Sequence, residues 1–522
     1  MVRVRYAPSP TGSPHVGNIR TALYNYLMAR RYKGKFILRI EDTDQTRKVE
    51  GAVEEILESL RWLKLDWDEG PEKGGEYGPY FQSQRLELYH KVCQELLRRG
   101  AAYKCFCTPE ELEKMREYQR INKLPTMYDR RCRWKKQSEI EKLEQSGMPY
   151  VIRLAMPTEG TIAFEDAVRG LVEYEASLID DQILLKSDGW PTYHLANVVD
   201  DHYQKISHVI RGDEWISSTP KHVVLYRAMD WELPVFAHAP IIKGPDGAKL
   251  SKRHGDVACL EFREKGYLPQ AVVNFIALIG WSPGGERELM TLREMEELFS
   301  LEGIQPSPGI FDITKLQWMN GHYIRQLSPQ ELYRTVKEYD ATTKNQEYLS
   351  SPKRKIFHEA LEKFPEEYVT KALVLEQERV KLLSEFASAC AFFFEEEPEL
   401  DPAAVEKWFS QEYVLKLFDF LIAYFEKKIT REETTQADKT LTELKTSSEV
   451  KTSLTVEDCE KAITEATEKL GLEKRSLAIH PTRVALTGRT YGPGLFELMA
   501  LLGPTRILER LHRAKEIVLS KQ

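Results

Sequence analysis

The start of the chain alternates short strand patterns with helical stretches and polar loops. Side chains at residues 2–6 alternate between apolar and polar, as in a half-buried strand, and residues 35–40 form a second short strand pattern. Between them, apolar residues recur at helical spacing over residues 19–30, and residues 52–63 have the pattern of an amphipathic helix. This order predicts an α/β domain with a parallel sheet. Its ligands would bind beyond the carboxyl ends of the strands, where residues 7–17 lie.

The α/β pattern returns in the middle of the chain. Residues 183–185 and 209–210 have strand patterns, and residues 221–229 have the pattern of a helix. We therefore expect the same α/β domain to be completed by residues far along the chain from its first strand.

The C-terminal part, beyond about residue 330, is predicted to be all helical. Long stretches such as residues 353–375 and 403–428 show helical periodicity with few strand signals. Residues 430–455 differ because they are rich in Thr, Ser, Lys and Glu and nearly free of large apolar side chains. Such a segment buries too little surface to order itself, so it is predicted to be a flexible insertion or a polar connection.

The length and composition are those of a soluble protein with several domains. A chain of 522 residues suggests about three to five domains, and 42% hydrophobic with 30% charged residues leaves ample material for buried cores. The net charge of −7 excludes a protein coated in positive charge. Residues 113–137 nevertheless hold nine Lys or Arg and three Asp or Glu. That segment is either a solvated helix and loop or an insertion that faces phosphates.

The sequence predicts a cytoplasmic protein. The N-terminus enters a strand pattern with no apolar signal core, and no stretch approaches the ~18 apolar residues that would cross a bilayer. Seven cysteines are few for this length and odd in number, so a disulfide scaffold is not expected.

Two motifs bring phosphate-binding groups onto loops. Residues 8–18 deliver His15 and Gly17 to the start of a helix, where first-turn N–H groups and the helix dipole favour negative charge. Lys249 and Lys252 follow a strong turn signal, so two flexible ammonium groups could converge on one polyanion. Alone, each motif also fits an ordinary solvated loop.

Taken together, the two motifs and the sequence around them resemble the catalytic core of bacterial-type glutamyl-tRNA synthetases, which are class I aminoacyl-tRNA synthetases. The matching stretches are residues 3–12, 38–44, 186–201 and 209–215, and residues 485–488 and 493–497 resemble the family's C-terminal pattern. The resemblance implies an α/β Rossmann-type catalytic domain with an α+β insertion, followed by all-α C-terminal anticodon-binding domains. The expected divisions are Rossmann halves at 1–77 and 195–245, an acceptor-binding insertion at 78–194, a stem-contact domain with the Lys-Leu-Ser-Lys-Arg loop at 246–330, and helical anticodon-binding domains at 331–400 and 401–522.

The resemblance also implies an activity and its residues. The expected reaction is ATP-dependent ligation of L-glutamate to tRNA(Glu) through a glutamyl-adenylate, with Mg²⁺ on the phosphates and with tRNA needed for activation. The residues expected to bind glutamate are Arg5, Ala7, Ser9, Glu41, Tyr193, Asn197 and Arg211. Those expected at ATP are His15, Gly17, Asn18, Glu214, Trp215, Ile242, Lys249, Ser251 and Lys252, of which His15, Lys249 and Lys252 would be catalytic.

The chemistry of glutamate agrees with that set. Arginine meets a carboxylate with a planar fork and keeps its charge, which suits Arg5 and Arg211, and Glu41 would receive the α-ammonium. One position departs from many class I enzymes, because Asn18 stands where they have a second His. Phosphate contacts would therefore depend more on His15 and on backbone N–H groups.

Two further sites follow from the resemblance. Cys105, Cys107, Tyr128 and Cys132 match residues that hold zinc in some members, and Zn²⁺ prefers four tetrahedral ligands. The pattern leaves a structural Zn²⁺ and buried free thiols both open. Arg379 lies where the family places an arginine that inspects the third anticodon base.

Several related functions differ from this one in features that the sequence shows. Whether tRNA(Gln) is also charged is left open by the sequence, and a monomer is expected. A glutaminyl-tRNA synthetase would have a β-barrel anticodon-binding part, so the predicted helical C-terminal part argues against it. A non-catalytic tRNA-binding paralogue would be expected to lose His15, Lys252 or Arg5, and this sequence keeps all three. A shortened relative that glutamylates a tRNA(Asp) base, or a nucleotidyltransferase without tRNA, would lack the region after residue 330.

Lys252→Ala is expected to lower the rate of adenylate formation much more than it weakens glutamate binding, because its charge matters most as pyrophosphate leaves. Single-turnover adenylate formation and equilibrium glutamate binding measure the two quantities. An equal loss in both would contradict the assigned role.

Overall fold

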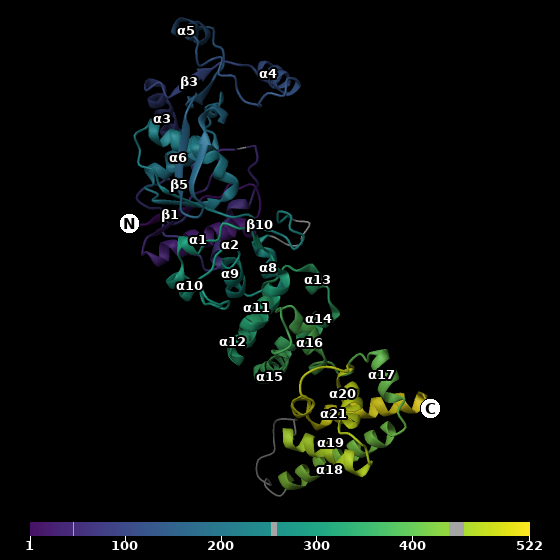
Figure 1. Ribbon diagram of the computed structural model, residues 1–522. Helices are drawn as coiled ribbons and strands as arrows, with labels where there is room; N and C mark the ends of the chain where they lie inside the picture. Colours follow the sequence, from purple (N-terminus) through teal and green to yellow (C-terminus); the bar gives the residue numbers. More distant parts are fainter. Residues whose placement is uncertain (45, 252–257, 438–453, 522) are drawn as a thin grey trace. The chain divides into compact units, whose positions relative to one another are not determined.

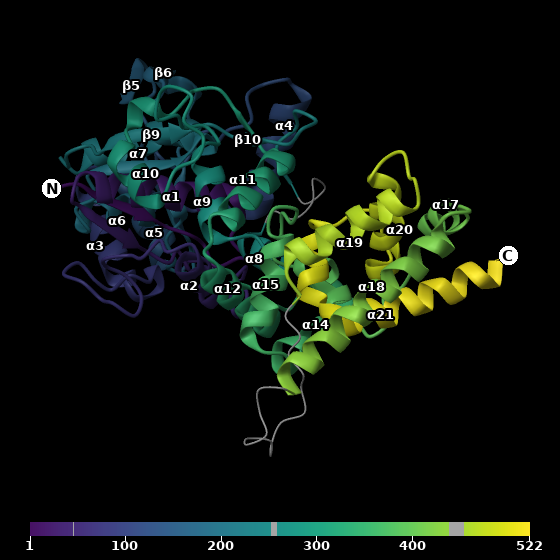
Figure 2. The same ribbon diagram turned by 90° about the horizontal axis from the view of Figure 1, so that it is seen from below.

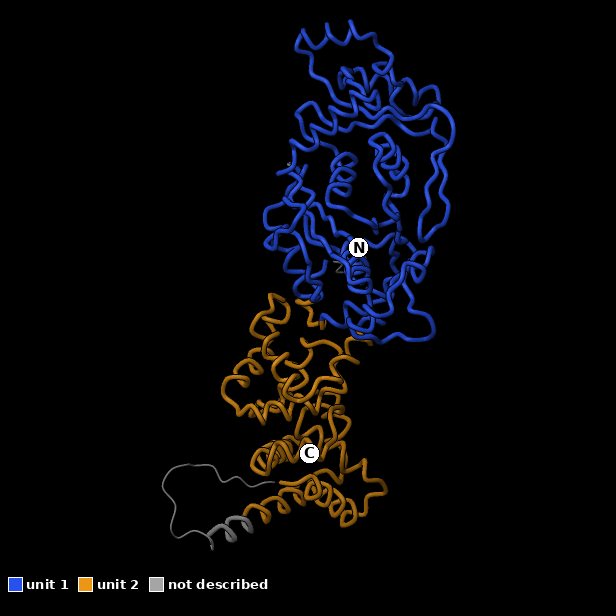
Figure 3. Tube along the Cα trace, turned by 90° about the vertical axis from the view of Figure 1, so that its left-hand side faces the viewer, with its two compact units in different colours: residues 1–262, 269–316 blue, residues 263–268, 317–522 orange. Residues whose placement is uncertain are grey.

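The computed structural model describes every residue except 45, 252–257, 438–453 and 522. Two compact units make up the chain (Figure 3). The first, here called the N-terminal unit, comprises Met1–Phe262 and Pro269–Leu316, and the second, the C-terminal unit, comprises Arg263–Leu268 and Gln317–Gln522. The finer division into six parts stays a prediction.

The N-terminal unit begins with two parallel strands joined by a helix (Figure 1). β1 (Arg3–Tyr6) pairs with β2 (Lys35–Leu38), and α1 (Val16–Arg31) connects them. Every residue of β1 is buried, and so are most residues of α1, because this helix is packed on several sides. Both predicted strands and the helix between them are confirmed.

A four-stranded sheet adjoins β1 and has the order β6-β5-β9-β8. Its strands are β5 (Thr161–Asp166), β6 (Gly170–Glu175), β8 (His208–Gly212) and β9 (Val235–Ala239). β5, β9 and β8 run parallel, and β6 folds back on β5 as a hairpin. The predicted insertion therefore contributes two strands to a sheet that contains strands of the predicted catalytic domain.

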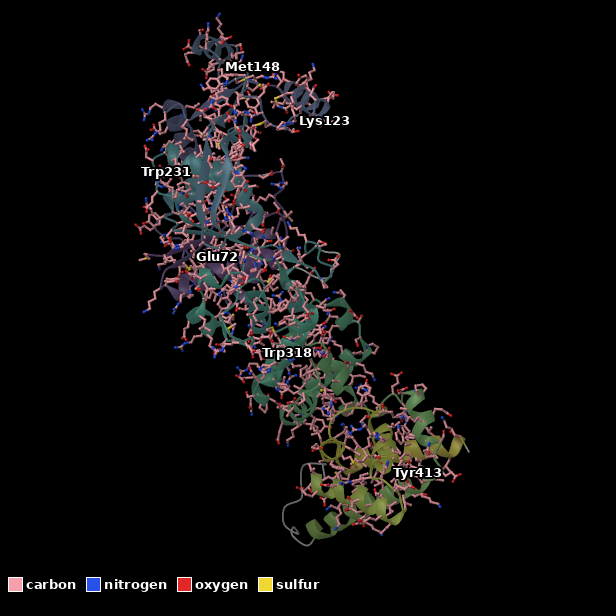
Figure 4. All side chains as sticks on the ribbon, viewed as in Figure 1. Glu72, Lys123, Met148, Trp231, Trp318 and Tyr413 are labelled. Atoms are coloured by element: carbon pink, nitrogen blue, oxygen red, sulfur yellow. The ribbon has the colours of Figure 1, made fainter. Side chains whose placement is uncertain are left out.

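The rest of the insertion is a mixture of helices and antiparallel strands, as predicted. β3 (Ala102–Cys105), β4 (Val151–Leu154) and β7 (Ile183–Leu185) form one sheet. The helices of this region are α3 (Leu86–Arg98), α4 (Pro109–Ile121), α5 (Gln137–Gln145) and, next in the chain, α6 (Tyr193–Tyr203). Lys123, in the basic segment 113–137, follows α4 and is labelled in Figure 4.

The remaining elements of the N-terminal unit complete its core. They are α2 (Ala52–Trp62), α7 (Thr219–Ala228), β10 (Ile242–Lys243), α8 (Cys259–Lys265, which crosses into the C-terminal unit), α9 (Pro269–Ala277), α10 (Leu292–Leu298), β11 (Gly309–Ile310) and α11 (Ile313–Arg325, which also crosses). β10 pairs in parallel with β11. The segment that carries Lys249 directly follows β10, and Lys249 forms an antiparallel bridge with Lys243 of β10.

The C-terminal unit is helical throughout its described residues. Its helices are α12 (Pro329–Thr342), α13 (Gln346–Leu349), α14 (Pro352–Lys363), α15 (Glu366–Glu376), α16 (Glu385–Cys390), α17 (Pro402–Phe409), α18 (Val414–Ala437), α19 (Val456–Lys469), α20 (Ser476–Thr487) and α21 (Leu495–Lys521). Figure 2 shows α18, α19 and α21 packed against one another.

The helical periodicity of residues 353–375 and 403–428 is confirmed. Residues 353–375 span α14 and α15, which are separated at Phe364 and Pro365, and residues 403–428 span α17 and the first part of α18. The predicted polar connection 430–455 begins too early, since α18 continues to Ala437. Residues 438–453 of that connection lie outside the described residues. Among the described helices, none is long and apolar enough to span a membrane.

Candidate active site

Two adjoining cavities open beside α1 in the N-terminal unit. One has a volume of about 750 Å³ and the other about 590 Å³. The residues that line both are Ser13, His15, Asn18, Thr21, Gly212 and Glu214. Ligand sites of parallel sheets lie beyond the carboxyl ends of the strands, and these cavities lie where β1 and β8 end.

The larger cavity, here called the nucleotide cavity, gathers most of the residues predicted to bind ATP. Those that line it are His15, Gly17, Asn18, Glu214, Ile242, Lys249 and Ser251. Trp215 lines the smaller cavity instead. Lys252 lies outside the described residues. The sequence motif at residues 8–18 and residues 249–251 of the second motif, more than two hundred residues apart, therefore meet at one cavity.

His15 is held in a defined orientation at the N-terminus of α1. Its Nδ1 accepts a hydrogen bond from Gly17 N–H at 3.1 Å, and its own backbone N–H donates to Asn18 Oδ1 at 3.4 Å. Burial, together with the charge of Lys249, lowers the pKa of His15 despite the opposing effect of Glu214. The neutral ring therefore carries its proton on Nε2, which can donate to an anion.

Gly17 is needed for a local reason. A Cβ at this position would lie 3.0 Å from Cε1 and 3.2 Å from Nδ1 of His15. Any other residue would therefore press on the imidazole that Gly17 N–H orients.

The smaller cavity, here called the amino-acid cavity, gathers all seven residues predicted to bind glutamate. They are Arg5, Ala7, Ser9, Glu41, Tyr193, Asn197 and Arg211. Arg5 is 3% exposed and forms a forked ion pair with Asp201, with Nε 3.0 Å from Oδ1 and Nη2 3.2 Å from Oδ2. One edge of its guanidinium is thus engaged by the protein.

Arg39 connects this ion pair to Glu41. Its Nη1 donates to Asp201 Oδ1 at 2.8 Å and its Nη2 to Glu41 Oε1 at 3.0 Å. Burial raises the pKa of Glu41 against the pull of Arg39 and Arg5. Asn197 Nδ2 also donates to Glu41 Oε1, at 3.3 Å. A carboxylate so placed in a cavity wall can receive a cation such as an ammonium group.

Arg211 has different surroundings from Arg5. Its Nε donates to His238 Nε2 at 3.0 Å, its Nη2 to Thr219 Oγ1 at 2.9 Å and its Nη1 to Tyr193 Oη at 3.4 Å. Burial raises the pKa of Tyr193 to about 12, so its hydroxyl stays protonated. The Tyr193 ring stacks on Trp215 with centroids 4.1 Å apart.

Sequence reasoning missed the residues that hold these groups in place. Asp201, on α6, contacts Arg5, and it also accepts a hydrogen bond from Arg39, which follows β2. His238, on β9, and Thr219, on α7, contact Arg211. Asp201 and Arg39 lie within or beside stretches that matched the family, but nothing in their spacing indicated that they pair.

A third cavity of about 230 Å³ adjoins the amino-acid cavity. Ser9, Glu41 and Tyr193 line both, and Arg47 and Lys186 bring cations to the third. Among the described residues that line the three cavities, six are cationic (Arg5, Arg20, Arg47, Lys186, Arg211 and Lys249) and four carry a carboxyl group (Glu41, Asp44, Glu214 and Glu261), of which Glu41 alone is buried. Such surroundings suit a substrate with several negative charges.

The predicted metal-binding residues also come together. The Sγ atoms of Cys105, Cys107 and Cys132 all lie within 4.8 Å of one another, and those of Cys107 and Cys132 are 3.5 Å apart. Tyr128 Oη lies 3.3 Å from Cys105 Sγ and 3.4 Å from Cys107 Sγ. Hydrogen bonding with Cys132 and Tyr128 lowers the pKa of Cys105, although burial opposes this effect.

Arg379 follows the end of α15 in the C-terminal unit. Its Nη1 donates to the carbonyl oxygen of Leu375 at 3.2 Å, and its side chain is exposed. The neighbouring Glu376 is 3% exposed, and burial raises its pKa to about 7 against the charges of Arg379, Arg489 and Arg483. Arg379 thus belongs to a group of cations contributed by separate parts of this unit.

Comparison with known proteins gives one consistent family. Residues 1–318 match the model for the class I tRNA synthetase (E and Q) catalytic domain, and residues 347–515 match an anticodon binding domain. Similar curated proteins are glutamate–tRNA ligases of Moorella thermoacetica (43% identical, 98% of both chains) and Dehalococcoides mccartyi (44%, 98% of this chain and 97% of that one). A glutamate tRNA ligase of Elizabethkingia meningosepticum, solved in complex with its amino acid, superposes with a TM-score of 0.85 at 33% identity over 99% of both chains.

Asp201→Asn is expected to destabilise the N-terminal unit by about 3–5 kcal/mol, because it leaves Arg5 and Arg39 buried with one compensating charge removed. Burial works to raise the pKa of Asp201, but both arginines hold it below its ordinary value, so the group is charged when it is removed. Thermal and denaturant unfolding measure the change.

Asp230→Asn is the matched control, since Asp230 pairs with Arg99 at the surface and is 82% exposed. It should cost less than about 1 kcal/mol. Equal losses of unfolding free energy in the two variants would show that the buried ion pairs of Asp201 stabilise the protein no more than an exposed ion pair does.

Proposed function

Because the chain belongs to the class I aminoacyl-tRNA synthetases specific for glutamate and glutamine, and within them to the glutamate–tRNA ligases, we propose that it joins L-glutamate to tRNA(Glu) with ATP. The observation that carries this proposal is the pair of cavities that share His15, Asn18 and Glu214. One offers a helix N-terminus and Lys249 to phosphates, and the other offers two guanidinium groups and a carboxylate to an amino acid with two carboxylates.

Glutamate would bind in the amino-acid cavity through complementary charge. Its side-chain carboxylate would meet the free edge of Arg5 and the charge of Arg211, and its ammonium group would meet Glu41. The α-carboxylate would then face the nucleotide cavity across the shared wall. Tyr193 and Asn197 supply polar groups around the substrate.

ATP would bind with its phosphates over the N-terminus of α1. His15 Nε2–H, the first-turn N–H groups and Lys249 would stabilise the charge that gathers on the phosphate oxygens, and Ile242 would contact the adenine. Mg²⁺ would enter with ATP and neutralise part of the phosphate charge. Lys252 is proposed to act with Lys249.

The proposed reaction has two displacements and no covalent bond to the enzyme. The α-carboxylate oxygen of glutamate attacks the α-phosphorus of ATP, and pyrophosphate leaves with the electrons of the broken P–O bond. A hydroxyl of the terminal tRNA ribose then attacks the carbonyl carbon of the adenylate, gives up its proton, and AMP leaves. Positioning and fixed positive groups account for the catalysis in both steps.

The tRNA would contact both units. The basic segment 113–137 of the insertion is proposed to approach the acceptor end, and the helical C-terminal unit to read the anticodon, with Arg379 at the third base. The helical character of that unit disfavours a glutaminyl-tRNA synthetase, whose anticodon-binding part is a β-barrel. We propose a cytoplasmic monomer, and none of the seven cysteines, all of which are among the described residues, forms a disulfide.

The decisive experiment measures aminoacylation with labelled glutamate and glutamine on purified tRNA(Glu), tRNA(Gln) and tRNA(Asp). Glutamate should be transferred to tRNA(Glu), and the tRNA(Gln) arm decides whether that tRNA is charged as well. In the same preparation, isotope exchange between pyrophosphate and ATP should be weak until tRNA(Glu) is added. Full exchange without tRNA would refute the requirement for tRNA, and transfer of glutamine alone would refute the proposed substrate.

We also propose that the cysteine cluster holds one structural Zn²⁺. Three sulfur atoms converge, and the 3.5 Å between Cys107 and Cys132 Sγ is close to the ~3.7 Å expected for thiolates around a tetrahedral Zn²⁺ with bonds of ~2.3 Å. Tyr128 lies against two of the sulfurs and is the candidate for the fourth position. The metal would tie β3 to the segment after α4.

Metal analysis tests the cluster directly. Purified protein should contain about one Zn²⁺ per chain, and Cys132→Ala should lose most of it because three donors bind far more weakly than four. Cys93→Ala, at a buried cysteine outside the cluster, should keep the metal. Metal-free wild-type protein with unchanged stability would instead favour buried free thiols.

A further inference from the structure

Three adjacent parallel strands place Asp166, His238 and Arg211 side by side. The residues come from β5, β9 and β8, each near the carboxyl end of its strand, and Arg211 is paired in register with His238. All three are buried, with exposures of 3%, 0% and 4%. Only Arg211 of the three lines the amino-acid cavity.

The direction of each hydrogen bond in this row follows from arginine, which can only donate. Arg211 Nε–H lies 3.0 Å from His238 Nε2, so Nε2 must accept and carry no proton. The proton of the neutral ring is then on Nδ1, which donates to Asp166 Oδ2 at 2.6 Å. His238 therefore connects Asp166 to Arg211 in a single tautomer.

Asp166 is itself fixed by the backbone. Its Oδ1 accepts from Val168 N–H and Arg169 N–H, each at 3.0 Å, and from His238 N–H at 3.4 Å. Oδ1 therefore accepts only from backbone N–H groups, and Oδ2 is the oxygen that faces the imidazole. The carboxylate cannot turn without breaking these bonds.

A second imidazole completes the surroundings of Arg211. His222 Nδ1 lies 3.3 Å from both Nη1 and Nη2, so it also accepts, and its Nε2–H donates to His194 Nδ1 at 3.1 Å. Together with Thr219 and Tyr193, every described partner of Arg211 is neutral. Arg5 differs, because Asp201 already compensates its charge.

We propose that Asp166 and His238 are positioning residues for the amino-acid substrate, and that the neutral shell around Arg211 reserves its charge for the substrate's carboxylate. The proposal rests on the proposed function, since it needs glutamate in the amino-acid cavity. It also gives a reason for selecting an anionic side chain: a buried guanidinium without a carboxylate partner gains most from a ligand that supplies one. A neutral amide would leave that charge uncompensated.

Two substitutions of His238 separate its two hydrogen bonds. In His238→Asn, the amide nitrogen can keep the bond to Asp166, but no acceptor remains for Arg211 Nε–H. In His238→Gln, the amide oxygen can replace Nε2 as that acceptor. We expect the KM for glutamate to rise about 10- to 100-fold in His238→Asn and clearly less in His238→Gln, with the KM for ATP little changed in both.

Asp166→Asn tests the tautomer. The backbone donors require the amide oxygen at the Oδ1 position, so the amide N–H₂ would face His238 Nδ1 and push the ring proton to Nε2, against Arg211 Nε–H. The KM for glutamate should rise as in His238→Asn while the unfolding temperature stays near that of His238→Gln. Equal losses of glutamate and ATP affinity in all three variants would indicate a merely structural role and overturn the proposal.

The outcomes also distinguish this proposal from the proposed function. Wild-type protein that fails to charge tRNA(Glu) with glutamate would refute the function. Wild-type protein that charges normally, with a KM for glutamate in His238→Asn within about twofold of wild type, would refute the positioning role alone.

Discussion

The buried pairing of Asp201 with Arg5 and Arg39 is the interaction on which the site depends. Charges this deeply buried need ionic or hydrogen-bonding partners in good geometry, because desolvation costs several kcal/mol per ion. Asp201 on α6 therefore fixes where β1 and β2 present Arg5 and Glu41. The preceding residue, Asp200, accepts hydrogen bonds from Arg85, Gln82 and Tyr89 and ties the insertion to the same helix. Two adjacent residues of α6 thus position several elements around the amino-acid cavity.

The two cationic side chains of that cavity are prepared in opposite ways. Arg5 is held by a carboxylate and contributes shape and direction, whereas Arg211 is held by neutral groups and contributes net charge. Neither arrangement would suffice alone, since two uncompensated guanidinium groups would repel each other in a buried space. The cavity balances the cost of burial against the need to attract an anion.

The local pattern of apolar and polar residues was enough to predict the helices and strands, but not which side chains contact one another. The first strands and α1 lie where periodicity predicts them. The residues expected to bind glutamate or ATP line the two cavities, apart from Lys252, which lies outside the described residues; Trp215, expected at ATP, lines the amino-acid cavity. Asp201, His238 and Asp166 could not be found this way, because their contacts depend on strand order and on which side of a helix meets the sheet. The polar connection expected from residue 430 also starts later than local composition indicated, because α18 continues to Ala437. Polar composition predicted a break, but polar residues can extend a helix that the preceding residues have already nucleated.

The shared wall of the two cavities has a consequence for the reaction intermediate. An aminoacyl-adenylate joins the two substrates covalently, so it would occupy both volumes and gain the contacts of each without a second loss of translational freedom. Its residence time should therefore exceed that of either precursor. A labile mixed anhydride would stay sheltered from hydrolysis until the nucleophilic ribose arrives.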